Sequence, residues 1–138
     1  MQNTVAPRQH AALLDELRRL LPAVALGTAD LALLQTDIFY VAEHPPLAVA
    51  TPRDVEQVQQ LVRAARRLGL SLAARGAGLS YSAGYIPGDE RTVVVDMTAM
   101  RRITAINVED RLVTVEPGVT WAALHEALAH VGLTTPFW

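Results

Sequence analysis

The stretch RGAGLSYS, residues 75 to 82, decides how this chain is interpreted. It follows Leu70–Ala74, a short apolar segment that we expect to form a strand. Two glycines around an alanine let the backbone turn sharply and bring several N–H groups to one point. With serine hydroxyls and an arginine beside them, they favour a loop that binds a phosphate or pyrophosphate. On composition alone, a tight turn that only joins two strands stays an open alternative.

The pattern before the loop predicts a β-α-β unit. Leu47–Ala50 is expected to be a short buried strand. Thr51 as the N-cap and Pro52 as the first helical residue would start a helix whose apolar residues keep helical spacing up to Gly69. The strand Leu70–Ala74 then closes the unit.

After the loop the pattern predicts three more strands and a helix. The strands are expected at Thr92–Asp96, Ile103–Asn107 and Leu112–Glu116. Thr120 would cap the helix and Gly132 would end it. The side chain of Trp121, on this helix, is expected to lie in the hydrophobic core of the domain. A β-α-β unit followed by further strands and a helix indicates an α+β fold.

The N-terminal region predicts an amphipathic helix over Gln9–Leu21, which Pro22 ends. Residues 27–41 show no regular period, and residues 37–40 are expected to form a turn with exposed aromatics. We place a domain boundary near Ala42, with an N-terminal helical segment at 1–41 and the second domain at 42–138.

Composition excludes several kinds of chemistry. The 138 residues carry a net charge of −2, which argues against binding nucleic acid by nonspecific phosphate attraction. There is no cysteine, so disulfides, thiolate nucleophiles and cysteine metal sites are excluded. His125 and His130, five positions apart, do not share a helix face, so we expect no metal site. Without a signal peptide or an apolar run of about 20 residues, a cytoplasmic protein is expected. Because the chain ends on Phe137 and Trp138, we expect it to be truncated within a larger fold.

Two well-known glycine motifs do not fit the loop. In the Rossmann pattern G-x-G-x-x-G, Tyr81 occupies the third glycine position and no amphipathic helix follows. Asp96 stands about 20 residues downstream, as that pattern requires, but we expect it to form a turn at a strand end. A Walker A loop needs a lysine, and every basic residue of this chain is an arginine.

Several ordered blocks carry a resemblance to a known family. They are AVATP at 48–52, RGAG at 75–78 with Ser80, VVDMTAM at 94–100 and VEPGV at 115–119. From about Pro46 to Trp138 the chain resembles the FAD-binding (PCMH-type) domain of the vanillyl-alcohol oxidase / p-cresol methylhydroxylase flavoprotein superfamily. It is most similar to the glycolate oxidase / D-lactate dehydrogenase branch, which has a similar approach through Asp37 and Tyr40.

The resemblance implies a cofactor site for FAD. Backbone amides from Gly76 to Ser80 would wrap the pyrophosphate, with side-chain bonds from Ser80 and Ser82, while Arg75 would brace the loop. Pro117, Gly118 and Val119 would line the adenosine end. The implied cofactor-binding residues are Arg75, Gly76, Ala77, Gly78, Leu79, Ser80, Tyr81, Ser82, Pro117, Gly118 and Val119. Many relatives attach a histidine at the Leu79 position covalently to the flavin, so leucine implies noncovalent FAD here.

The resemblance also implies a function. This would be the FAD-binding portion of a flavin-dependent oxidoreductase that oxidises a small 2-hydroxy acid or alcohol. Family members continue into a second glycine-rich segment and a substrate domain, so the catalytic residues stay unknown and whether this chain is itself an enzyme stays open. The alternative is a non-catalytic fragment or accessory subunit that needs a partner chain or another copy of itself to complete the flavin site. A nonflavin module for a nucleotide or small phosphate ligand ranks last.

Overall fold

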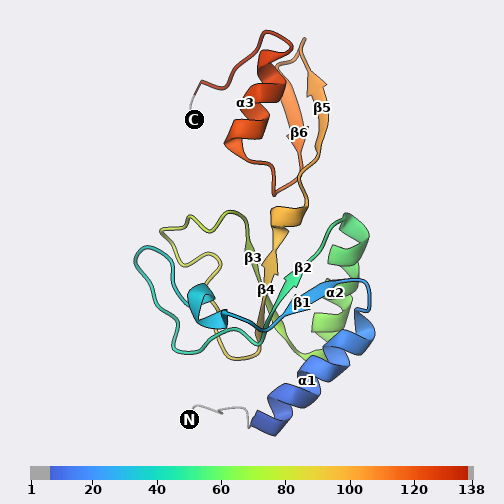
Figure 1. The fold of residues 1–138 in the computed structure, drawn as a ribbon, viewed down its shortest axis with the longest axis vertical. Coiled ribbons are helices and arrows are strands. Elements are labelled where there is room, and N and C mark those ends of the chain that lie inside the picture. Colours follow the sequence, from blue (N-terminus) through green and yellow to red (C-terminus); the bar gives the residue numbers. More distant parts are fainter. Residues whose placement is uncertain (1–6, 137–138) are drawn as a thin grey trace.

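The computed structural model describes residues 7–136, which form a main lobe and a smaller C-terminal lobe (Figure 1). The arrangement is the predicted α+β fold, in which a β-α-β unit is followed by further strands and a helix. In chain order the elements are α1 (Pro7–Leu20), β1 (Ala25–Gly27), the 3-10 helix η1 (Leu31–Leu34), β2 (Ala48–Thr51), α2 (Val55–Leu68), β3 (Ser71–Arg75), β4 (Thr92–Asp96), the 3-10 helix η2 (Met97–Ala99), β5 (Ile103–Asn107), β6 (Leu112–Val115) and α3 (Trp121–Ala129).

The main lobe contains a four-stranded sheet with the order β1-β2-β4-β3. Strands β2, β4 and β3 run parallel, whereas β1 pairs antiparallel with β2 at one edge. Strand β4 therefore lies between the two strands of the β-α-β unit, and its residues Thr92 to Val95 are all buried. A continuous β-branched run is typical of a parallel strand that is covered on both faces.

Helix α2 begins at Val55, so the predicted start at Thr51 and Pro52 is wrong. Its N-cap is Asp54, whose carboxylate accepts the amide N–H of Gln57 at 2.8 Å. Thr51 instead belongs to β2. The negative charge of a carboxylate is stabilised near the positive end of a helix, which favours Asp54 as the cap. The predicted end of this helix is confirmed, because the residue at position 69 has a positive φ of 62°.

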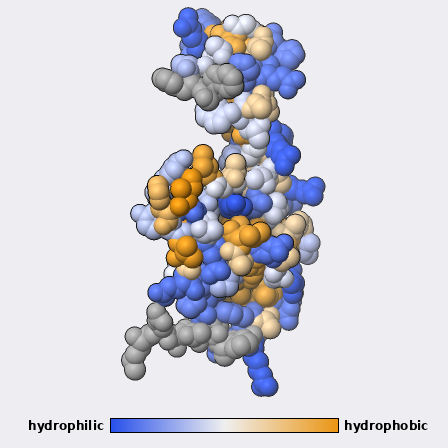
Figure 2. Space-filling view, turned by 60° about the vertical axis from the view of Figure 1, so that its left-hand side comes forward, coloured by the Kyte–Doolittle hydropathy of each residue, from blue (hydrophilic) through white to orange (hydrophobic). Residues whose placement is uncertain are grey.

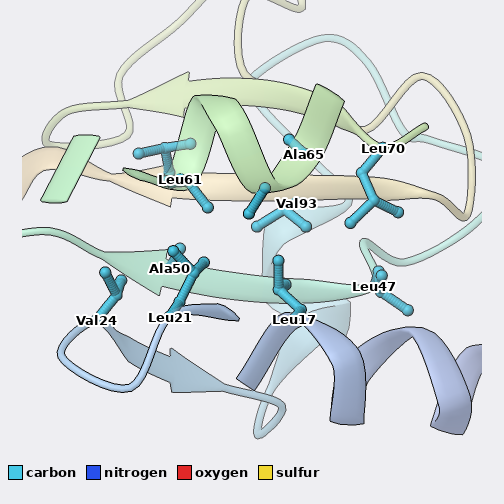
Figure 3. Packing of buried hydrophobic residues seen from close by; sticks show 11 residues of the cluster. Leu17, Leu21, Val24, Leu47, Ala50, Leu61, Ala65, Leu70 and Val93 are labelled. Atoms are coloured by element: carbon cyan, nitrogen blue, oxygen red, sulfur yellow. The ribbon is translucent and has the colours of Figure 1, made fainter. Parts of the chain in front are cut away.

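Helices α1 and α2 contribute to a single core on the same face of the sheet (Figures 1 and 3). Leu17 of α1, Leu61 of α2 and Val93 of β4 are each fully buried in this core. Burying one such side chain contributes roughly 1.5–3 kcal/mol. The predicted helix over 9–21 is confirmed and starts two residues earlier than expected. The boundary near Ala42 stays a prediction, and side chains on both sides of it share this core.

Two short elements lie in a region for which the sequence predicted no regular structure. Strand β1 has three residues, too few to show an alternating pattern, and it exists because β2 offers it an edge to pair with. The 3-10 helix η1 follows Asp30, which adopts a left-handed conformation with φ 53°. The predicted turn at residues 37–40 is confirmed, and its aromatic side chains are exposed.

The smaller lobe consists of the β5–β6 hairpin and α3. Thr120 caps α3 as predicted, since its hydroxyl accepts the amide of Ala123 at 3.2 Å. Trp121, expected in the core, is 64% exposed. The first turn of α3, residues 121–123, is exposed within the described range, as is much of the hairpin. Phe137 and Trp138 lie outside the described residues. No helix in the described range is long and apolar enough to span a bilayer.

Candidate functional site

The loop of residues 75–84 starts at the carboxyl end of β3, next to the end of its parallel neighbour β4. Arg75 and Asp96 are register partners at this edge of the sheet. In open parallel sheets, ligands bind in the crevice outside the carboxyl ends of the strands. The predicted anion loop therefore lies where the topology of the sheet favours a ligand.

The two glycines of the loop have different roles. Gly78 has a positive φ of 86°, and a Cβ atom there would lie 2.8 Å from Arg75 Cζ. A side chain at this position would be strained and would push the guanidinium aside. A Cβ atom on Gly76 would meet only the carbonyl oxygen of Pro117, at 3.9 Å. Position 76 therefore has room for a small side chain. Its closeness to Pro117 shows that the two predicted cofactor segments lie side by side.

Four consecutive amides of this loop are available to a ligand. The N–H groups of Ala77, Gly78, Leu79 and Ser80 donate no hydrogen bond to any of residues 7–136. Two carbonyl groups of the same stretch are engaged, since Gly78 O accepts the Tyr85 hydroxyl at 2.7 Å and Ser80 O accepts the amide of Ile38 at 3.5 Å. A run of unpartnered N–H groups in a turn is the chemistry of an anion-binding nest.

Arg75 and Tyr85 lie beneath the loop. The Arg75 guanidinium carbon lies 5.2 Å from the centre of the Tyr85 ring, in a cation–π arrangement. Arg75 Nε is buried and has no hydrogen-bond partner within the described range. Tyr85 is itself buried, and its hydroxyl donates to the carbonyl of Gly78. Sequence reasoning did not include Tyr85 in the site and missed this supporting contact.

A cavity of about 290 Å³ adjoins Arg75 on the sheet face that carries Val49 and Val94. Asp96 also lines it, at the end of β4. The Asp96 carboxylate accepts the amide of Thr98 at 2.9 Å and caps η2. The prediction that Asp96 forms a turn at a strand end is therefore confirmed.

The side chains of residues 79–82 do not converge on one point. Ser80 Oγ accepts the amides of Ser82 and Gly84 at 3.3 Å each, so this hydroxyl stabilises the turn. Leu79 is 73% exposed. Tyr81 is also exposed, and its ring centre lies 5.8 Å from that of Phe39. The side-chain contacts of these residues with a cofactor stay predictions.

Asp37 joins the loop from a distant part of the chain, and sequence reasoning did not include it in the site. Its Oδ1 accepts the amides of Phe39 and Tyr40 at 2.9 and 2.8 Å, and its Oδ2 accepts the amide of Ala83 at 2.9 Å. Partial burial raises the pKa of Asp37, but hydrogen bonds from these three amides and the Ser80 hydroxyl outweigh it and hold the pKa below its usual range. An aspartate at the start of a turn can be recognised from the local sequence. Its hydrogen bond to Ala83, 46 positions away, leaves no signal in the sequence.

In the second predicted segment, residues 117–119, the backbone N–H groups are already hydrogen-bonded within the protein. Gly118 N donates to Met100 O at 2.7 Å, and Val119 N donates to the carbonyl of Glu116 at 3.1 Å. Pro117 has no N–H. A Cβ atom on Gly118 would lie 2.6 Å from Met100 O and would also collide with Met97 O. Packing against the backbone around η2 thus explains this glycine, and the contact of the segment with adenosine stays a prediction.

An ion pair stands directly before this segment. Glu116 Oε1 accepts Nε and Nη2 of Arg102 at 2.8 and 2.7 Å, and Glu116 Oε2 accepts the Arg102 backbone amide at 2.7 Å. The hydrogen bonds from the Arg102 side chain and then from its backbone amide lower the pKa of Glu116, against a smaller effect of burial. The same pair raises the pKa of Arg102. The pair holds together the base of the β5–β6 hairpin.

Residues 46–138 match the family model described as FAD binding domain. D-lactate dehydrogenase (cytochrome), mitochondrial, of Arabidopsis thaliana is 33% identical over 98 residues, which cover 71% of this chain and 17% of that protein. The glycolate oxidase subunit GlcD of Escherichia coli (strain K12) is 36% identical over 84 residues, 61% of this chain and 17% of that protein. D-2-hydroxyglutarate dehydrogenase of Xanthomonas citri pv. viticola is 30% identical over 122 residues, 87% of this chain and 26% of that protein.

Solved structures share the fold. A 4-ethylphenol oxidase from Gulosibacter chungangensis in complex with isoeugenol superposes with a TM-score of 0.73 at 28% identity, covering 96% of this chain and 26% of the oxidase. A p-cresol methylhydroxylase with bound substrate gives the same TM-score at 24% identity, covering 96% of this chain and 27% of that one. The chain spans between 17% and 27% of these relatives and structures. The resemblance expected from the sequence is confirmed, and the chain belongs to the FAD binding domain family of PCMH type.

Proposed function

We propose that this chain is the FAD-binding portion of a flavin-dependent oxidoreductase whose substrate is a small 2-hydroxy acid or alcohol. The observation that carries the cofactor assignment is the run of unpartnered amides at residues 77–80. The oxygens of a pyrophosphate carry negative charge and are suited to accept these N–H groups. Bound FAD supplies two-electron redox chemistry, while the protein binds and orients it.

Each segment of the site has a distinct part in this proposal. The amides of residues 77–80 hold the pyrophosphate, and Arg75 braces the loop from below. Residues 117–119 shape the adenosine end without donating hydrogen bonds. Leu79 has no nucleophilic atom, which supports noncovalent FAD. We assign no residue of this chain to catalysis.

The names of three relatives support the substrate class. Lactate, glycolate and 2-hydroxyglutarate, after which these enzymes are named, are all 2-hydroxy acids. The chain aligns with only 17% to 26% of the length of these proteins. The substrate is therefore proposed from the relatives' names and is not assigned to any residue described here. The cytoplasmic location expected from the sequence also stays part of the proposal.

The second candidate is a non-catalytic fragment or accessory subunit that needs another chain to complete the flavin site. It is favoured by large apolar side chains that are exposed around the loop, namely Leu33, Phe39, Val41, Leu79 and Tyr81. Figure 2, with the loop side of the main lobe turned forward, shows apolar side chains gathered there. Exposed apolar patches of this kind mark interaction surfaces. One relative is itself named a subunit.

A visible spectrum tests the cofactor assignment. The purified chain is mixed with FAD, desalted and scanned for the flavin band. We expect the band to be retained by the wild-type chain and lost in Gly78→Asp, which fills the turn and adds a negative charge. Gly88→Asp is the matched control, because a Cβ atom at that position meets nothing within 4 Å. A colourless wild-type chain would overturn the claim that this chain alone binds FAD.

A second experiment separates the two candidates. D-lactate or glycolate is added without oxygen to the chain loaded with FAD. Bleaching of the flavin band shows that the chain oxidises a 2-hydroxy acid without help. A stable flavin band together with bound FAD supports the fragment or accessory subunit.

A further inference from the structure

We propose that Asp37 is a positioning residue that sets the conformation of the loop at residues 77–84 and so presents its free amides outward. The turn at residues 36–40 holds the Asp37 carboxylate, and the carboxylate holds the far side of the loop. What the loop binds rests on the proposed FAD site, whereas the way the loop is held does not.

The carboxylate is fixed before it reaches the loop. Asp37 Oδ1 accepts two amides of its own turn, those of Phe39 and Tyr40. The Asp37 amide donates back to Tyr40 O at 3.1 Å, which closes the turn. Asp37 is half-buried, and its side chain is therefore oriented by local bonds.

Its second oxygen holds the loop at a strained position. Oδ2 accepts the amide of Ala83 at 2.9 Å. Ala83 has a φ of 57°, in the left-handed region that residues other than glycine disfavour. The Ser80 hydroxyl supports the same loop from within, since it accepts the amides of Ser82 and Gly84. A charged acceptor thus stabilises a backbone conformation that alanine would not adopt readily by itself.

Other contacts join the same two segments. The amide of Ile38 donates to Ser80 O at 3.5 Å, and the Tyr85 hydroxyl lies between the carbonyls of Thr36, at 3.3 Å, and Gly78, at 2.7 Å. None of these contacts uses the N–H groups of residues 77–80. We call these contacts of the turn at residues 36–40 and of Tyr85 with the loop the clasp. At residues 77–80 the clasp binds only carbonyl groups, so it leaves the four N–H groups free.

The arrangement requires a carboxylate. Two acceptor oxygens serve three amides, whereas asparagine has one acceptor oxygen and an NH₂ group that only donates. In Asp37→Asn, the amide oxygen can keep the bonds to Phe39 and Tyr40. The NH₂ group would then face the N–H of Ala83, and that bond is lost.

Hydrogen exchange of the FAD-free chain tests the clasp directly. We expect the Ala83 and Gly84 amides to exchange roughly tenfold faster in Asp37→Asn, the scale of one lost hydrogen bond to a charged group. Asp54→Asn is the matched control. It removes the same charge from another carboxylate that accepts a backbone amide at 2.8 Å, at the start of α2, and it should leave the loop unchanged.

FAD titration tests what the clasp does for the site. We expect roughly tenfold weaker FAD binding in Asp37→Asn, with the wild-type affinity kept in Asp54→Asn. Adding Ala83→Gly to Asp37→Asn should restore part of the affinity, because glycine adopts the left-handed conformation unaided. Ala83→Gly alone is the control, because this substitution is itself expected to stabilise the fold. A larger gain in affinity in the Asp37→Asn background than in the wild type supports the positioning role, and an equal gain in both would overturn it.

The outcomes are distinguishable. Unchanged exchange at Ala83 in Asp37→Asn would overturn the clasp whether or not FAD binds. Faster exchange with unchanged FAD affinity would overturn its role in presenting the amides. A wild-type chain that binds no FAD, together with faster exchange in Asp37→Asn, would overturn the proposed function and support the clasp.

Discussion

The two segments that the sequence assigned to the cofactor are built in opposite ways. The loop at 75–84 leaves four consecutive amides without a partner and is supported from below by side chains from other parts of the chain. The segment at 117–119 donates its available amides to the protein and packs its glycine against the backbone around η2. Only the first can bind an anion with its backbone. A glycine within a family motif can thus serve the packing of the protein itself.

The largest effect on stability is expected from Gly118→Ala. The new Cβ atom would overlap the carbonyl oxygens of Met97 and Met100, which belong to backbone and cannot rotate away. We expect a loss of about 3 kcal/mol in the free energy of unfolding, the upper part of the range for overpacking. Urea denaturation measures it, with Gly88→Ala as a control in open space. A change as small as that of the control would show that the segment is not held by packing.

Tyr85→Phe should have the next largest effect, this time on the loop. Removing the hydroxyl leaves the Gly78 carbonyl without the donor that it has at 2.7 Å. We expect about 1 kcal/mol of destabilisation, the typical value of one buried hydrogen bond. Tyr81→Phe is the matched control, because Tyr81 is exposed. Thermal unfolding of the two variants compares them, and equal midpoints would argue that the loop does not depend on Tyr85.

Local signals predicted most of the fold. The β-branched run of β4, the helical spacing of α2 and the Thr120 cap each lie within a few residues, and the structure confirms all three. The start of α2 was misplaced because Thr51 and Asp54 are both good capping residues. Thr51 is taken up by the pairing of β2 with β1, and the charge of Asp54 suits the helix N-terminus. The three residues of β1 carry no periodic signal at all.

The site was predictable only in part, because it depends on contacts between residues that lie far apart in the sequence. The motif at 75–78 located the loop, but which of its groups are free depends on partners far along the chain. Asp37 reaches Ala83 across 46 positions, and Gly118 is shaped by the backbone of Met97 and Met100. Spacing within a motif carries no information about such contacts. The resemblance therefore treated two unlike segments as one kind of site.

A smaller effect, of opposite sign, is expected from Ala83→Gly. Glycine adopts φ 57° without the cost of roughly 1–2 kcal/mol that alanine meets, but it loses more entropy on folding. We expect a net stabilisation of about 0.5 kcal/mol. Ala42→Gly, at a loop position without positive φ, should instead destabilise by a similar amount. Urea denaturation of both variants checks the sign, and destabilisation by Ala83→Gly would show that position 83 is unstrained.

Acidification is expected to have the smallest effect on the stability of the fold. Each segment has a carboxylate of lowered pKa beside it, Asp37 for the loop and Glu116 for the segment at 117–119. A carboxyl group with a lowered pKa in the folded state contributes stability above its ordinary pKa, and the contribution is lost as the pH falls through the lowered value. We therefore expect both contributions to be present at neutral pH and to fade below about pH 4. Arg102 stays charged throughout, so the acid response of the pair belongs to Glu116.

Amide exchange between pH 7 and pH 3, corrected for the intrinsic rates, separates the two carboxylates. Ala83 should lose protection in acid in the wild type and in Glu116→Gln, but it should show no such step in Asp37→Asn. The amide of Arg102, which Glu116 accepts at 2.7 Å, should show the reverse dependence on the two variants. If both amides responded to both substitutions, the loop and the segment at 117–119 would form one cooperative unit. Independent responses would show that the chain holds its anion loop and its packed glycine by separate means.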